Sequence, residues 1–205
     1  MSRSTLLRAL RAGALCLTAT TTATVIPAAA DAHVGVSSKR LNIQSGSRVT
    51  VKGRVAAPMT VRLQIQRRGR WVTLDRDRTN RAGKFVLRKR MFGALSTRAR
   101  VRLNSGETRI LGRLNVYRRA LASWYGPGLF GNKLGCGGTL QVGSLGVANK
   151  SLPCGTKVTI RHRGRVVRVR VIDRGPYVGG REYDLTAATA RKLGFIGHGP
   201  IQVTR

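Results

Sequence analysis

A run of alternating side chains near the C-terminus constrains the fold more than any other feature. From Val167 to Val171 valine alternates with arginine, and the run continues through Ile172 to an acid, Asp173. Successive side chains of a strand point to opposite faces, so this period of two predicts a strand with one apolar and one basic face. Asp173 falls on the apolar side, at its edge. The chain has only seven acidic residues against 39 basic ones, so an acid placed there is a candidate functional group.

The first 32 residues are typical of an export signal. Three arginines precede an apolar, threonine-rich stretch at 12–26, and residues 30–32 satisfy the small-x-small rule for cleavage. Threonines interrupt the stretch and a proline follows it, so we expect no transmembrane segment in the mature chain. A lipoprotein anchor at Cys16 is disfavoured, because a leucine rather than a small residue precedes it. The protein is therefore expected to be secreted or associated with the cell wall.

Two cysteines, Cys136 and Cys154, remain after the signal. In an exported protein an even pair favours a disulfide, and two buried free thiols are the alternative. A zinc site has little support, because no Cys-x-x-Cys or histidine pair lies nearby. We expect neither a metal nor a cofactor.

The formal net charge of +32 favours anionic partners. For an exported protein these are anionic wall polymers or lipid headgroups, and we expect no specific nucleic-acid partner. An arginine-rich, solvated surface without a dedicated partner is the alternative interpretation. We expect the protein to be a monomer.

Short alternating runs separated by turn residues fill residues 33–118. The runs with a strand pattern are 49–55, 61–66, 71–74, 84–87, 98–103 and 109–116. This spacing of strands and turns predicts an immunoglobulin-like (Ig-like) β-sandwich.

The composition changes at a boundary near 117–120, because glycine becomes frequent and charge density falls. Short strands are predicted at 157–160, 165–172 and 200–204, with a hairpin turn at 162–164. A helix is predicted at 185–193, with Asp184 as its N-cap and Gly194 at its C-terminal end. Residues 119–205 are therefore expected to form a small closed β-barrel with one short helix.

Four motifs follow one another in this second segment. They are Ala122-Ser123-Trp124-Tyr125-Gly126, the segment 147–158, Val171-Ile172-Asp173-Arg174-Gly175-Pro176-Tyr177, and the segment 181–194. In this order and spacing they resemble the double-psi β-barrel of the rare lipoprotein A (RlpA) family, which comprises septal peptidoglycan lytic transglycosylases and their relatives. The resemblance implies an all-β chain, with a six-stranded double-psi β-barrel and one short helix after the sandwich. A more distant resemblance links the barrel to expansins.

The resemblance also implies that Asp173 is the catalytic residue. It would protonate the glycosidic oxygen and then accept a proton as a 1,6-anhydro-muramyl ring closes. One carboxylate suffices for this scheme, whereas glycoside hydrolysis usually requires two. The family's Ala-Ala-His motif reads Val147-Ala148-Asn149 here, and asparagine cannot shuttle protons near neutral pH. Gly138 also stands where the family often has Glu or Gln.

Four further residues are candidates for substrate binding. Tyr125 can stack on a sugar ring or fill the barrel, and Tyr177 stands close to Asp173 in sequence. Arg174 can hold a substrate carboxylate or serve the structure. His198 lies between two glycines of a loop.

The sequence therefore predicts an exported protein that binds or acts on peptidoglycan glycan strands in the manner of a lytic transglycosylase. The alternative is a non-catalytic peptidoglycan-binding or expansin-like wall-loosening module, which Asn149 and Gly138 favour.

Overall fold

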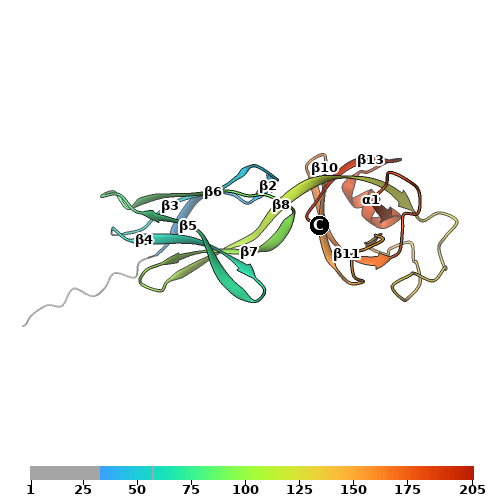
Figure 1. The fold of residues 1–205 in the computed structure, drawn as a ribbon, viewed down its shortest axis with the longest axis horizontal. Coiled ribbons are helices and arrows are strands. Elements are labelled where there is room, and N and C mark those ends of the chain that lie inside the picture. Colours follow the sequence, from blue (N-terminus) through green and yellow to red (C-terminus); the bar gives the residue numbers. More distant parts are fainter. Residues whose placement is uncertain (1–32, 57) are drawn as a thin grey trace, which may run out of the picture. The chain divides into compact units, whose positions relative to one another are not determined.

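The computed structural model describes residues 33–56 and 58–205 (Figure 1). The expected signal peptide at 1–32, with Cys16, lies outside the described residues. The described residues form thirteen strands and one helix. Their bounds are β1 (Gly35–Arg40), β2 (Asn42–Gln44), β3 (Arg48–Arg54), β4 (Thr60–Arg67), β5 (Arg70–Arg78), β6 (Lys84–Arg90), β7 (Leu95–Leu103), β8 (Thr108–Tyr125), β9 (Gly146–Ala148), β10 (Lys157–His162), β11 (Arg165–Asp173), β12 (Tyr183–Thr186), α1 (Ala187–Leu193) and β13 (Gly199–Val203).

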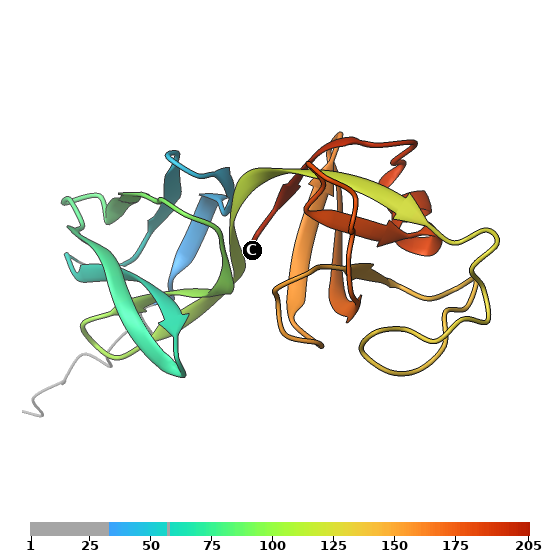
Figure 2. The same cartoon turned by 45° about the vertical axis from the view of Figure 1, so that its right-hand side comes forward.

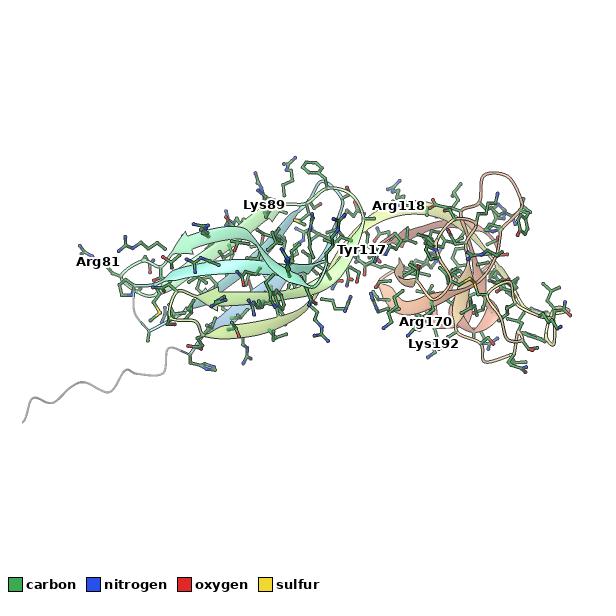
Figure 3. All side chains as sticks on the ribbon, turned by 60° about the horizontal axis from the view of Figure 1, so that its bottom comes forward. Arg81, Lys89, Tyr117, Arg118, Arg170 and Lys192 are labelled. Atoms are coloured by element: carbon green, nitrogen blue, oxygen red, sulfur yellow. A yellow bond between two sulfur atoms is a disulfide. The ribbon has the colours of Figure 1, made fainter. Side chains whose placement is uncertain are left out.

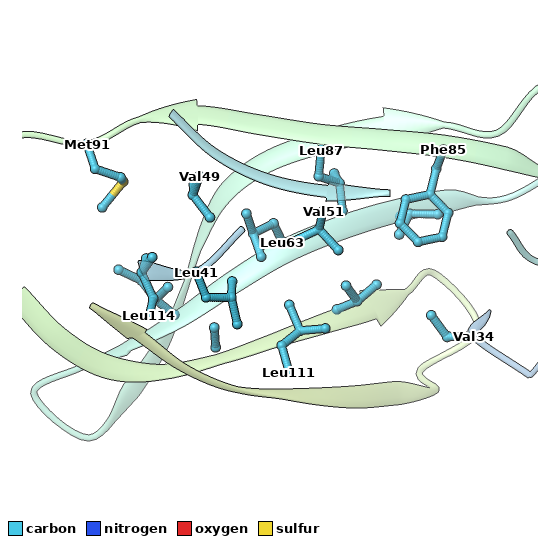
Figure 4. Packing of buried hydrophobic residues seen from close by; sticks show 14 of the residues in the cluster. Val34, Leu41, Val49, Val51, Leu63, Phe85, Leu87, Met91, Leu111 and Leu114 are labelled. Carbon is cyan, nitrogen blue, oxygen red and sulfur yellow. The ribbon is translucent and has the colours of Figure 1, made fainter. Parts of the chain in front are cut away.

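The N-terminal segment consists of two groups of strands around one apolar core. Strands β1, β3 and β6 form a three-stranded sheet, and β5, β4, β7 and the first part of β8 form the other, with β2 paired to β8. Val49, Val51 and Leu87 from the first sheet face Leu63 and other residues of the second (Figure 4). The predicted strands are thus confirmed, and the arrangement is sandwich-like. The specific likeness to an immunoglobulin fold stays a prediction.

One glycine of β3 is required by the packing between these strands. A Cβ atom at Gly53 would lie 2.2 Å from the carbonyl oxygen of Gly35 and 2.4 Å from the ring of Phe85. Both approaches are far shorter than van der Waals contact, so the tight β1–β3 pairing over Phe85 depends on the absence of a side chain there.

Strand β8 runs without interruption through the region where the sequence indicates a boundary. It continues past Tyr117, which is 1% exposed, and its last residues pair with β13 and β12. Two separate hydrophobic clusters lie before and after this point, one ending at Val116 and the other beginning at Ala120. The predicted domain limits themselves stay a prediction, since the described residues fall within one compact unit.

The second segment is a closed six-stranded barrel. Its strands follow the order β12-β9-β11-β10-β13-β8, and parallel pairing of β12 with β8 closes the ring. Closure leaves no free sheet edge. In β11, Val169 and Val171 are buried while Arg168 and Arg170 are exposed, which confirms the predicted alternation. The segment between β8 and β9, drawn in yellow and ochre in Figure 2, contains no strand.

The prediction that Asp184 caps the helix is wrong. Thr186 is the N-cap, and its hydroxyl accepts a hydrogen bond from the backbone N–H of Thr189. Residues 183–186 are held extended because β12 pairs with β8 on one side and with β9 on the other, so the helix cannot begin before Ala187. Gly194 ends the helix in the left-handed conformation, with φ 61°, as expected.

The cysteine pair forms a disulfide, as the sequence indicates. Cys136 and Cys154 are 18 residues apart, and their Cα atoms are separated by 5.5 Å. The bond ties the strandless segment after β8 to the loop that follows β9. Among the described residues, no helix combines the length and hydropathy needed to cross a bilayer.

Removal of this disulfide is expected to destabilise the protein. The double variant Cys136→Ser, Cys154→Ser should unfold with a free energy about 3 kcal/mol lower, because the unfolded chain regains the entropy of a loop of this length. Urea unfolding followed by tryptophan fluorescence measures the difference. Dithiothreitol should reproduce the loss in the parent protein and change nothing in the double variant. Equal urea midpoints for the two proteins would contradict the prediction.

Candidate functional site

Asp173 lies at the end of β11 with one carboxylate oxygen held by the backbone. Its Oδ1 accepts hydrogen bonds from the N–H groups of Gly135, at 2.7 Å, and Arg174, at 2.8 Å. Gly135 can approach because it has no side chain: a Cβ there would lie 2.8 Å from Cγ of Arg174. The hydroxyl of Tyr125 also interacts with this carboxylate. Asp173 is thus oriented by two backbone N–H groups and faces the phenol of Tyr125.

A small pocket of about 190 Å³ opens at this carboxylate. It is lined by Asp173 and Tyr125 and by residues of the segment between β8 and β9, namely Leu129, Asn132, Lys133, Leu134 and Leu140. The sequence analysis identified none of the residues from that segment, because it has neither periodicity nor a motif. Lys133 is the cation of this pocket, which gives the site one positive and one negative group.

A second acid, Asp184, stands close to the first. It lies in β12 opposite Ser123 of β8. Burial raises the pKa of Asp184 above its usual 3.8, and the charge of Asp173 adds to this, while Ser123 and Arg181 act in the opposite direction. The shift shows that the Asp184 carboxyl is withdrawn from water and lies within electrostatic reach of Asp173. Sequence reasoning had assigned this residue to the helix cap and so missed it.

Tyr125 completes the cluster. Burial raises the pKa of its phenol, and the negative charges of Asp173 and Asp184 raise it further. The hydroxyl of Tyr125 faces Asp173 and that of Ser123 faces Asp184, but these hydroxyls and Oδ1 of Asp184 are buried without a well-formed hydrogen bond to the described residues. Buried polar atoms nearly always have good partners, so this loosely paired cluster is a candidate place for a ligand or water to bind.

Asn149 is next to Asp173 in space, but its side chain is committed to the backbone. It is 3% exposed; its Nδ2 donates to the carbonyl of Glu182 at 3.0 Å, and its Oδ1 accepts from the N–H groups of Ser151 and Leu152. Its own N–H donates to the carbonyl oxygen of Asp173 at 3.2 Å. Asn149 therefore anchors the turn after β9 against the end of β11, and it does not line the pocket.

Arg174 has a comparable structural place. Its guanidinium donates to the carbonyls of Asn149, at 3.0 Å, and Leu152, at 2.7 Å, and to Sγ of Cys154. These contacts match the structural alternative for this residue. Glu182 forms an ion pair with Arg118, the one such pair among residues 33–56 and 58–205.

The remaining candidates are not brought together with Asp173. Tyr177 follows the strand end after a cis Gly175–Pro176 bond and is 81% exposed. His198 lies in the loop before β13 and lines a different pocket. Of the four residues predicted to bind substrate, the structure places only Tyr125 in the pocket of Asp173.

The barrel segment is similar to known proteins. Residues 118–205 match a family model described as "Lytic transglycolase". This segment is 44% identical over 81 residues to a protein named probable endolytic peptidoglycan transglycosylase RlpA from Synechocystis, and 44% identical over 87 residues to one of the same name from Aquifex aeolicus. An endolytic peptidoglycan transglycosylase RlpA from Campylobacter jejuni is 44% identical over 85 residues. The resemblance of the barrel segment to RlpA is therefore confirmed.

The matches cover only part of each protein. They span 38%, 42% and 40% of this chain and 25%, 38% and 31% of these three relatives. A solved chain titled "Biofilm associated protein - BSP domain" aligns with 12% identity and a TM-score of 0.28, which is too low to inform the fold.

The buried carboxyl of Asp184 makes stability depend on pH in a defined direction. Because the folded-state pKa is raised, the protonated acid is favoured in the fold: this contribution is complete below pH 3.8 and is lost as pH rises through the folded-state value. Asp184→Asn, which cannot ionise, should therefore gain stability relative to the parent as pH rises, with little difference at the acidic end. Urea unfolding from pH 3.5 to 8 measures this trend.

Asp77→Asn is a suitable control, since it removes the same charge from β5 and its carboxylate accepts a hydrogen bond from Val86. A difference between the parent and Asp184→Asn that stays constant over the pH range would contradict the assignment.

Proposed function

We propose that residues 119–205 act on the glycan strands of peptidoglycan as a lytic transglycosylase, with Asp173 as the acid and base. The observation that carries this proposal is a carboxylate held by two backbone N–H groups, with Tyr125 and a second, buried carboxyl, Asp184, beside it. The similarity of the same residues to proteins named as peptidoglycan transglycosylases supports the substrate class.

The reaction needs no activated water. The Asp173 carboxyl gives its proton to the glycosidic oxygen as the bond from that oxygen to the anomeric carbon breaks. The 6-hydroxyl oxygen of the same muramyl residue then bonds to the anomeric carbon, and its proton passes to the Asp173 carboxylate. The products are a free hydroxyl on one fragment and a 1,6-anhydro-muramyl end on the other, and the acid is regenerated.

The surrounding residues have distinct tasks in this scheme. Asp184 holds its proton to a higher pH than an exposed acid, because burial favours the neutral form. It supplies a second carboxyl within electrostatic reach of Asp173. Tyr125 borders the pocket with a neutral phenol, and Lys133 offers a cation to an anionic part of the substrate. Asn149 and Arg174 hold the loops that shape the site and are positioning residues.

Export to the cell envelope belongs to this proposal. The signal at 1–32 would deliver a monomeric mature chain to the wall, where its basic surface would also meet anionic wall polymers. The role of the sandwich at 33–118 would be to attach or space the barrel.

A second candidate is a non-catalytic peptidoglycan-binding or expansin-like module. It is favoured by Asn149, which stands where the family has a histidine and whose polar atoms are all engaged by the backbone. Such a site would hold a glycan strand without a proton-shuttling partner for Asp173.

The enzyme proposal predicts that Asp173→Asn abolishes cleavage. Mature protein incubated with purified sacculi should release anhydro-muropeptides detectable by mass spectrometry, and the variant should lose at least 10²-fold of this rate, the usual contribution of an acid–base group. Asp77→Asn serves as the matched control and should retain full activity. Equal release by the Asp173→Asn variant would refute the role of Asp173. No release by the parent, with retained pelleting on sacculi, would establish the binding module.

Replacement of Asn149 tests the second candidate directly. If only the missing histidine silences the barrel, Asn149→His should raise anhydro-muropeptide release at least tenfold, since an imidazole can shuttle protons near neutral pH. Asn149→Gln keeps an amide that cannot shuttle protons and should not raise release. Equally low release by both variants would contradict the hypothesis that the residue at position 149 limits the reaction.

A further inference from the structure

A second pocket of the barrel, separate from that of Asp173, has a strongly basic lining. Its volume is about 560 Å³, and it is bordered by β8, the β10–β11 hairpin, the loop after α1, and β13. The side chains that can carry positive charge there are Arg119, Arg161, Arg163, His162 and His198. None of its lining residues lines the pocket of Asp173.

Strand register places two of these arginines on either side of the pocket floor. Arg161 of β10 lies opposite Gln202 of β13, and Gln202 lies opposite Arg119 of β8. The three residues thus form one row across adjacent strands, and the two arginine Cα atoms are separated by two strand spacings, about 10 Å. Long guanidinium side chains at this separation can reach one ligand between them from both sides.

The opposite wall comes from the hairpin and from the loop after the helix. Arg163 occupies the β10–β11 turn with a φ of 44°, and it is exposed. The ring of His162 packs edge-on against Phe195, with 5.1 Å between ring centroids, which fixes the imidazole at the pocket rim. His198 is exposed on the loop that leads into β13. Cationic and imidazole groups from four separate segments therefore converge on one space.

Within the described part of the chain these groups have no anionic partner. The acids of residues 33–205 are Asp75, Asp77, Glu107, Asp173, Glu182 and Asp184, and none lines this pocket. Arg119, Arg161 and Arg163 donate no side-chain hydrogen bond to any described residue. Unpaired like charges repel one another, so a bound anion would relieve a cost that the folded protein carries.

From this arrangement we propose that the pocket of Arg119, Arg161, Arg163, His162 and His198 binds a phosphate ester. A carboxylate has two oxygens in one plane, which a single arginine satisfies. A phosphate group presents its oxygens tetrahedrally and accepts hydrogen bonds from donors that approach from several directions, as they do here. The pocket exceeds the size of phosphate alone, and Phe195, Ile196 and Pro200 supply an apolar wall for the organic part of the ester.

Two sources present this chemistry outside a cell, a phosphodiester-linked polymer and a phospholipid headgroup. The proposal concerns the phosphate group that they share. It does not depend on the reaction at Asp173, because the two pockets have no residue in common.

The test measures binding of glycerol 3-phosphate to the full mature chain by calorimetry and by NMR. The chain has three histidines, and the side-chain signals of His162 and His198 should shift on binding while that of His33 stays in place. Acetate at equal concentration should leave all three unchanged. Equal shifts with acetate, or equal shifts at His33, would overturn the proposal.

Variants test whether the ester binds at this pocket or is attracted only by the overall positive charge of the chain. The double variant Arg119→Ala, Arg161→Ala should weaken binding at least tenfold. If that variant fails to fold, Arg163→Gln with His198→Gln, both at exposed positions, serves as a second pair. The matched control is Arg81→Ala with Lys89→Ala, two exposed cations of the N-terminal segment that are labelled in Figure 3, and it should change affinity less than twofold. Equal losses in pocket and control variants would show that only net charge attracts the ligand.

Two further experiments identify which molecule supplies the phosphate group and separate this proposal from the proposed reaction at Asp173. Binding of poly(glycerol phosphate) and of phosphatidylglycerol vesicles is measured with and without glycerol 3-phosphate as competitor. The carrier that glycerol 3-phosphate displaces is the one that the pocket accepts. If glycerol 3-phosphate displaces neither carrier, the assignment is overturned. Asp173→Asn should bind the phosphate ester like the parent, and the pocket variants should keep whatever activity on sacculi the parent has.

Discussion

The parallel pairing of β12 with the end of β8 is the constraint on which the rest of the barrel depends. It closes the ring of six strands and places Asp184 opposite Ser123 and Thr186 opposite Tyr125. The same pairing keeps residues 183–186 extended, so the helix starts at Ala187 and the carboxyl of Asp184 lies within electrostatic reach of Asp173 instead of capping a helix. The strand pairing that closes the barrel thus also brings the residues of the polar cluster together.

The chain has few acidic and many basic residues, so the position of each acid strongly affects the charge around it. Most arginines lie on outward positions of strands, where water solvates them. The informative exceptions are two local groupings: Asp173 with Asp184 in its electrostatic reach, and three arginines around a second pocket without anionic partners among the described residues. The first grouping contains buried polar atoms without well-formed partners, and the second contains like charges that repel one another, so each costs stability in the absence of a ligand. That cost is the physical reason to regard them as binding sites.

Much of the local structure was predictable because it depends on short-range rules. The alternation at 167–171, the hairpin turn at Arg163 and the left-handed Gly194 follow from strand periodicity, turn geometry and helix termination. The site was predictable only through Asp173 and Tyr125. Asn149 stands in sequence where the family has its histidine, but its amide satisfies buried backbone groups, a role set by loops that meet only in the fold.

The sequence by itself determined an all-β chain with a disulfide and an acid at a strand end, since side-chain alternation, turn residues and cysteine count act locally. Only the tertiary structure decided which groups share a site with that acid. Lys133 and Asp184 lie 40 and 11 residues from Asp173 along the chain, and no periodic pattern links them. They meet because the barrel closes and the disulfide holds the loop between β8 and β9 over its end, and such long-range contacts depend on packing that no local pattern encodes.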